Sequence, residues 1–133
     1  MKEHVMRLKN GEDIKKKIVS YSDRIKIPAG IIICCVGSID HINIKLLNLK
    51  TIFNMKKRYQ IIGANGTISL DGININMAFA DEKGNVIGGE LLEGCIVDKT
   101  AEICILESDK YRFTREYDQK TKCKELNYHL RFY

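Results

Sequence analysis

Clustered cations are the residues of this chain whose types point most directly to a chemistry, because lysine and arginine side chains bind phosphate groups. They form two clusters, which are Lys15, Lys16 and Lys17, and then Lys56, Lys57 and Arg58. With a formal net charge of +5 and an isoelectric point near 8.9, they predict weak contacts to DNA phosphates without base recognition. The alternative is that both clusters are ordinary solvated surface residues.

No residue pattern predicts a catalytic nucleophile. Ser38 follows Gly37 after an apolar run, but the glycine pattern of a nucleophile elbow is absent and no helical pattern follows. The three histidines, His4, His41 and His129, are scattered and show no metal-ligand spacing. We therefore expect neither a nucleophile–histidine pair nor a histidine metal site.

The five cysteines predict no disulfide framework and no zinc ribbon, because none lies in a C-x-x-C pair. Cys34, Cys35 and Cys104 lie in apolar runs, where cysteine behaves as a small hydrophobic residue, and a reducing cytosol fits this usage. The N-terminus lacks a secretory apolar segment, and the longest apolar run, 27–36, is too short to span a bilayer. We expect a cytoplasmic protein without membrane contact.

The elements that must position these residues begin with a strand over 5–9 and a helix whose apolar face contains Ile14, Ile18 and Tyr21. Residues 29–36 predict a strand that is buried on both faces. A strand that alternates through Ile42 and Ile44 follows, and residues 48–58 lose this periodicity and predict a surface loop.

The rest of the chain predicts a meander of short strands, with tight turns at 70–73 and 81–85. Its strands are expected at 59–63, 65–70, 73–80, 86–92, 95–97, 100–107 and 112–117. Four glycines at 84–94 lie between β-branched residues, which predicts close backbone approach instead of a linker or a phosphate loop. We expect one α+β domain over 1–133, with a largely antiparallel, twisted, barrel-like sheet and one main helix near the N-terminus.

Several short motifs, in their order and spacing, give the chain a family resemblance. They include residues 7–13, Val36-Gly37-Ser38, Asn65 to Ser69, residues 80–95 and Arg115 to Asp118. Over nearly its whole length the chain resembles the plants-and-prokaryotes-conserved (PPC) domain. In plants this domain follows an AT-hook, but the Arg-Gly-Arg-Pro core of such a hook is absent here.

The resemblance also bears on metal binding. Related domains carry a His-x-His strand and a Gly-Gly-His turn that gather around a zinc-like metal, and the matching positions here are Asn74, Asn76 and Glu90. Two amides and one carboxylate are poor zinc ligands, so we expect no metal and no cofactor, and the similarity to zinc-dependent acetolactate decarboxylases is weakened. These residues either line a polar ligand pocket or are ordinary surface residues.

The resemblance implies a DNA-binding or regulatory protein, such as a transcriptional regulator, that assembles as a homotrimer. One alternative is a ligand-binding or enzymatic trimer with a polar site near Ser38, Asn74, Asn76 and Glu90 at the subunit interface. Another alternative is a protein-interaction scaffold.

Overall fold

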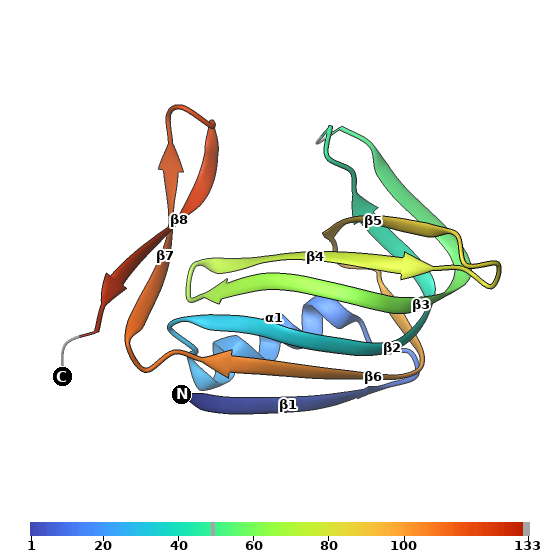
Figure 1. The fold of residues 1–133 in the computed structure, drawn as a ribbon, viewed down its shortest axis with the longest axis horizontal. Helices are drawn as coiled ribbons and strands as arrows, with labels where there is room; N and C mark the ends of the chain where they lie inside the picture. Colours follow the sequence, from blue (N-terminus) through green and yellow to red (C-terminus); the bar gives the residue numbers. More distant parts are fainter. Residues whose placement is uncertain (49, 132–133) are drawn as a thin grey trace.

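A computed structural model describes residues 1–48 and 50–131. Within them the chain forms eight strands and one helix (Figure 1). In chain order these are β1 (Lys2–Lys9), α1 (Ile14–Ile25), β2 (Gly30–Lys45), β3 (Ile52–Ser69), β4 (Gly72–Ala80), β5 (Val86–Leu91), β6 (Ile96–Glu107), β7 (Tyr111–Asp118) and β8 (Cys123–Leu130).

Six of the strands form one antiparallel sheet in the order β1-β6-β2-β3-β4-β5. The far end of β2 also pairs with β5, through Ile44 opposite Leu91 and Lys45 opposite Glu90, so the sheet partly closes into a ring. The predicted fold class, a largely antiparallel twisted sheet with one N-terminal helix, is therefore confirmed.

Helix α1 forms where the sequence supplies both a cap and an apolar face. The Asp13 side chain accepts a hydrogen bond from the Lys16 backbone N–H at 3.0 Å, which satisfies a free donor of the first turn. Ile14 and Ile18 are fully buried against the sheet, and the helix ends at Lys26 in a left-handed conformation. This helix covers one face of the sheet, and its contacts belong to the main hydrophobic core.

The opposite face of the sheet, which we call the outer face, is apolar and exposed over part of its area. In β2, Ile32 and Cys35 are buried in the core, whereas Ile33 and Val36 are 51% and 54% exposed. Val5 on β1 and Ile62 on β3 are also exposed. The prediction that residues 29–36 are buried on both faces is therefore wrong for the described chain, because α1 covers only one side.

The strands are longer than the sequence pattern indicates. The predicted loop at 48–58 is wrong over 52–58, which are the start of β3 and pair with β2, as in Ile44 opposite Phe53; residue 49 lies outside the described residues. The expected strands 59–63 and 65–70 belong to the same β3, which ends at Ser69, and 95–97 and 100–107 belong to the same β6, which begins at Ile96. Register shifts, such as the one between Ile61 and Gly63, interrupt the alternation without ending the strand.

The C-terminal strands β7 and β8 form a separate two-stranded hairpin that projects from the sheet (Figure 1). The Phe113 N–H donates to the Pro28 carbonyl at 2.8 Å, which ties the base of the hairpin to the start of β2. Strand β7 includes the predicted strand 112–117, but β8 was not predicted. Its signal in the sequence is the alternation of Leu126, Tyr128 and Leu130 with polar residues.

Candidate functional site

The three positions singled out by the family resemblance lie together on the outer face. Ile75 and Met77 of β4 are buried in the core, so Asn74 and Asn76 project from the opposite side of the strand. Asn76 lies directly opposite Glu90 of β5. The structure therefore brings these two amides and one carboxylate into one neighbourhood.

A glycine allows the strand that carries Glu90 to come close to β2. A Cβ atom added at Gly89 would lie 2.6 Å from the Lys45 carbonyl oxygen, which no side chain could accept without moving backbone. This packing places Glu90 opposite Lys45 in the β2–β5 pairing. The Lys45 ammonium Nζ lies 4.0 Å from the Glu90 Oε2. The expectation that the glycine-rich segment marks close backbone approach is confirmed at this position.

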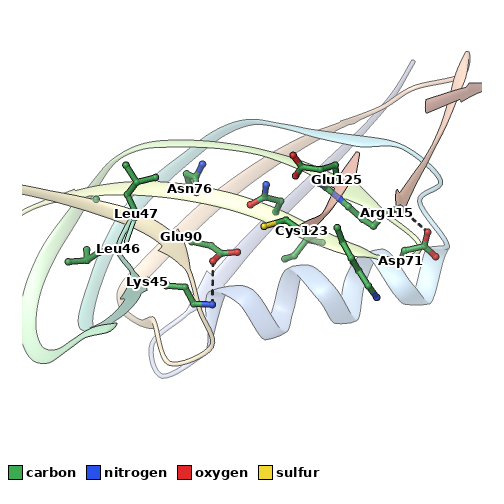
Figure 2. A pocket seen from close by; sticks show the side chains of 15 residues that line it. Lys45, Leu46, Leu47, Asp71, Asn76, Glu90, Arg115, Cys123 and Glu125 are labelled. Atoms are coloured by element: carbon green, nitrogen blue, oxygen red, sulfur yellow. Dashed lines mark hydrogen bonds and ion pairs between the residues drawn. The ribbon is translucent and has the colours of Figure 1, made fainter. Parts of the chain in front are cut away.

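Asn74, Asn76 and Glu90 line a cavity of about 590 Å³ between the sheet and the β7–β8 hairpin. Figure 2 shows Lys45 and Glu90 on one side of it, with Arg115, Cys123 and Glu125 of the hairpin on the other. This volume is in the range of small-molecule sites in proteins. The lining contains three cationic, three acidic and two amide side chains, which are Lys45, Arg115, Lys124, Asp71, Glu90, Glu125, Asn74 and Asn76.

Arg115 of the hairpin contacts the β3–β4 part of the sheet through two hydrogen bonds. Its guanidinium donates to the Thr67 hydroxyl at 2.5 Å, and its backbone N–H donates to the Asp71 carboxylate at 3.1 Å. Thr67 lies opposite Asn74 in the β3–β4 pairing, so the guanidinium lies next to the side chains of Asn74 and Asn76, which we call the amide row. The cavity can therefore offer hydrogen-bond donors and both signs of charge to a polar molecule.

Ser38 does not join this cavity within the chain. Its hydroxyl donates to the Asp98 carboxylate at 3.4 Å, and Asp98 also accepts a hydrogen bond from the Arg58 Nε at 3.2 Å. The hollow that Ser38 lines contains Arg58, Gln60 and Glu82 and shares no residue with the cavity around Asn76. No histidine contacts Ser38 among the described residues, so this neighbourhood contains no serine–histidine pair.

The two predicted cation clusters are partly neutralised by carboxylates. Lys57 contacts Asp81 at 3.2 Å, Arg58 contacts Asp98 and Glu82, and Lys17 contacts Glu12 at 2.6 Å. The hydrogen bond to Asp81 raises the pKa of Lys57, and the hydrogen bond from Lys17 lowers the pKa of Glu12.

The other three lysines of the two clusters differ from Lys17, Lys57 and Arg58. In the part of the chain that the structure describes, Lys15, Lys16 and Lys56 make no ion pair within 4.0 Å. Lys16 and Lys56 are exposed, whereas Lys15 is half-buried. The predicted clusters are thus mixed sets of paired and unpaired cations.

The sequence analysis missed a third group of cations at the tip of the β7–β8 hairpin. Lys120, Lys122 and Lys124 are exposed there, and Tyr117, which lies opposite Lys124, is 63% exposed. The Asp118 carboxylate accepts hydrogen bonds from the backbone N–H groups of Lys120 and Thr121, and these bonds stabilise the turn. A comparison of the net charge of successive segments of the sequence would have revealed this group of lysines.

The residues on the outer face do not fit a zinc ion. Over residues 1–48 and 50–131, no group of three or more histidine, cysteine, aspartate or glutamate residues is arranged to hold a metal. Asn74 and Asn76 offer only amide oxygens, and Glu90 is engaged with Lys45. In the same residues, no helix is long and apolar enough to cross a membrane.

An antiparallel sheet with one helix on a single face is the architecture of the class of domain to which the motifs pointed. The chain belongs to the family of the Plants and Prokaryotes Conserved (PCC) domain, which matches residues 1–109. The resemblance noted from the sequence is therefore confirmed. The match ends before the β7–β8 hairpin.

A curated relative extends the likeness into the hairpin. The chain is 31% identical over 122 residues to the bifunctional protein GlmU of Synechococcus sp. (strain JA-3-3Ab). The matched region is 92% of this chain but 20% of the relative, so the chain spans about a fifth of the length of that protein.

Solved structures share the fold at low identity. A hypothetical protein of Salmonella superposes with a TM-score of 0.95 at 24% identity, over 98% of this chain and 95% of that one. A candidate DNA-binding protein of Bacteroides thetaiotaomicron gives 0.81 at 17% identity, over 96% and 91%. The metal-containing protein AF0104 of Archaeoglobus fulgidus gives 0.81 at 19% identity, over 94% and 92%.

Proposed function

We propose that this chain is a DNA-binding protein that acts as a homotrimer and contacts duplex phosphates through lysine and arginine, without base recognition. The observation that carries the proposal is the concentration of positive charge in the projecting hairpin. Residues 110–133 contain seven lysines and arginines against three acidic residues, a net +4 of the chain's +5. The description of the Bacteroides thetaiotaomicron neighbour supports the same function.

The exposed lysines at the hairpin tip and on the body are the proposed phosphate contacts. Lys120, Lys122 and Lys124 alternate along the tip, and a two-stranded ribbon has a width that fits the major groove of duplex DNA. Lys16 and Lys56 add exposed charges on α1 and β3. Lys17, Lys57 and Arg58 are expected to contribute less, because each must give up a carboxylate partner to meet a phosphate.

Trimer formation would cover the apolar outer face. Val5, Ile33, Val36 and Ile62 are each at least half exposed in the isolated chain, and such clustered apolar surface favours association. A trimer would also present each hairpin tip three times, so that weak single contacts add through effective concentration.

The DNA proposal is tested with two matched triple variants of the full chain. Lys120→Ala with Lys122→Ala and Lys124→Ala should weaken binding to unrelated duplexes equally, measured by fluorescence anisotropy. It should also reduce the dependence of log K on log salt by about 0.9 for each phosphate that the variant no longer neutralises.

The control variant, Lys17→Ala with Lys57→Ala and Arg58→Ala, removes the same charge from ion-paired positions and should lose less affinity. Equal losses in the two variants would show that only net charge matters, and would contradict the assigned contacts.

Light scattering tests the assembly. A homotrimer has three times the 15.2 kDa mass of the chain at micromolar concentration. Val36→Lys places a charge on the outer face and should shift the mass toward the monomer, whereas Ile25→Lys, on the helix, should not. A monomer mass for the unmodified protein across micromolar concentrations would contradict the trimer.

The cavity around Asn76 supports a second candidate function, the binding of a small polar ligand. Its volume of about 590 Å³ and its row of amides suit such a molecule. A ligand of this site should raise the melting temperature of the unmodified protein but not that of Asn76→Leu, which blocks the amide row. A screen of small carboxylates and sugars that changes neither protein would contradict this candidate.

A further inference from the structure

Two cysteines oppose each other directly on the outer face. Cys34 of β2 and Cys104 of β6 are register partners in antiparallel strands, and the neighbouring Cys34 thiol raises the pKa of Cys104. Cys34 is exposed and Cys104 is half-buried. The register shift between Ile32 and Cys34 turns Cys34 outward beside its partner while Cys35 stays in the core.

This arrangement suits an intramolecular disulfide. Directly opposed residues of an antiparallel pair have Cα atoms about 4.5 to 5.5 Å apart, and disulfides form across about 4.4 to 6.8 Å. The two strands are already held in place by the surrounding ladder, from Ile32 opposite Ile105 to Val36 opposite Glu102. The register therefore favours a bond between these two side chains.

The other three cysteines are placed differently. Burial raises the pKa of Cys35 to about 12 and that of Cys95 to about 11, and both thiols lie in the core. Cys123 is exposed, but it lies on the distant end of the β7–β8 hairpin. Only Cys34 and Cys104 combine proximity with access for a reagent among the described residues.

We propose that Cys34 and Cys104 form a reversible dithiol–disulfide modification site whose reaction partners are low-molecular-weight disulfides of the glutathione type. The inference does not rest on DNA binding, but it requires Cys34, which neighbours Ile33 on the outer face, to stay accessible in any trimer. It assigns a role to a cysteine pair that the sequence analysis treated as small hydrophobic residues.

The exchange proceeds in two balanced steps. The Cys34 thiolate attacks one sulfur of the small disulfide, which breaks the S–S bond and releases one small thiol after protonation. The Cys104 thiolate then attacks the Cys34 sulfur, forms the protein disulfide and releases the second small thiol. Two protein thiols are oxidised and one small disulfide is reduced, with the two thiol protons passing to the two leaving groups.

Exposure assigns the first attack to Cys34, because Cys34 is exposed and Cys104 is half-buried. The neighbouring Cys34 thiol, followed by burial, raises the pKa of the Cys104 thiol, and the charges of Glu102 and Glu3 act in the same direction. Cys104 is the less accessible of the two, which suits the second, intramolecular step.

The test treats the native full chain with oxidised glutathione, then blocks free thiols and maps the peptides by tandem mass spectrometry. The expected product has lost two hydrogens, joins Cys34 to Cys104 and returns to the starting mass with dithiothreitol. Cys104→Ser should stop at a glutathione mixed disulfide on Cys34, whereas Cys123→Ser should form the same internal bond as the unmodified protein.

Two results would overturn the proposal. The first is a native protein that keeps all thiols free under these conditions, whatever its state of assembly. The second is an internal bond that joins Cys35 or Cys123 to another cysteine, since it would show that the register pairing does not decide the reaction.

Discussion

Gly37 shows how a single residue allows two neighbouring strands, β2 and β6, to come close together. Its φ is +149°, and a Cβ atom added there would lie 2.2 Å from the Thr100 carbonyl oxygen of β6. Gly37→Ala should therefore lower the free energy of unfolding by at least about 2 kcal/mol, since both the backbone conformation and the neighbouring backbone must change.

Gly63 is the matched control for this substitution, because a Cβ atom there meets no atom within 4 Å. Gly63→Ala should be neutral or stabilising by up to about 1 kcal/mol. Urea denaturation at one protein concentration measures both variants. Equal destabilisation by the two substitutions would contradict the assigned role of Gly37.

The amide row makes a second prediction at the residue scale. Asn74 and Asn76 lie on the same side of β4, and Glu90 lies opposite Asn76, so imidazoles at these positions would converge. Asn74→His with Asn76→His and Glu90→His should create stoichiometric zinc binding, whereas the unmodified protein should carry none after tag-free purification. Elemental analysis measures both, and zinc in the unmodified protein would contradict the account of these ligands.

At the scale of elements, the turn between β4 and β5 depends on one acid. Burial of the Asp81 carboxyl opposes its ionisation, but the N–H groups of Asn85 and Lys83 and the Lys57 ammonium outweigh it and lower its pKa to about 2. Because this folded-state pKa lies below the ordinary value of 3.8, the ionised group stabilises the fold above about pH 4. That stabilisation is lost as the pH falls through 2.

Asp81→Asn removes the charge and should lower the free energy of unfolding at neutral pH. It should also flatten the dependence of stability on pH between about 4 and 2, because the asparagine does not titrate. Denaturant titrations of both proteins at several pH values measure the difference. Parallel pH profiles for the two proteins would contradict the assigned role of the carboxylate.

The same scale shows what the sequence could predict and what it could not. The helix was predictable because Asp13 caps it and Ile14 and Ile18 repeat at helical spacing. Residues 52–58 were not, because Lys56, Lys57 and Arg58 are all exposed at the open end of β3, where no alternation marks a buried face. Strand β8 was missed because most of its residues are exposed.

The candidate site was predictable only in part, since its neighbours come from distant segments. Asn74, Asn76 and Glu90 were found through family motifs, and the structure brings them together. Arg115 reaches them only because the base of the hairpin lies beside the β3–β4 turn, and no local pattern encodes that contact. Ser38 was grouped with them, but it contacts Asp98 instead.

At the scale of the whole molecule, most of the net charge lies in the C-terminal hairpin, and the sheet carries an exposed apolar group of its own. Residues 110–133 carry +4 of the net +5, whereas the exposed apolar residues Ile33, Val36 and Ile62 lie on the sheet. This arrangement suits a sheet that associates with further copies of the chain and a hairpin that binds a polyanion.

The salt dependence of duplex binding by the unmodified protein tests the central claim most directly. Fluorescence anisotropy with two unrelated duplexes should give micromolar affinity at low salt, the same for both. A plot of log K against log salt should fall linearly, with a slope of about 0.9 for each phosphate contact, because released counterions drive the binding. No binding at low salt and micromolar protein would contradict the account, and the cavity around Asn76 would then be the leading candidate for function.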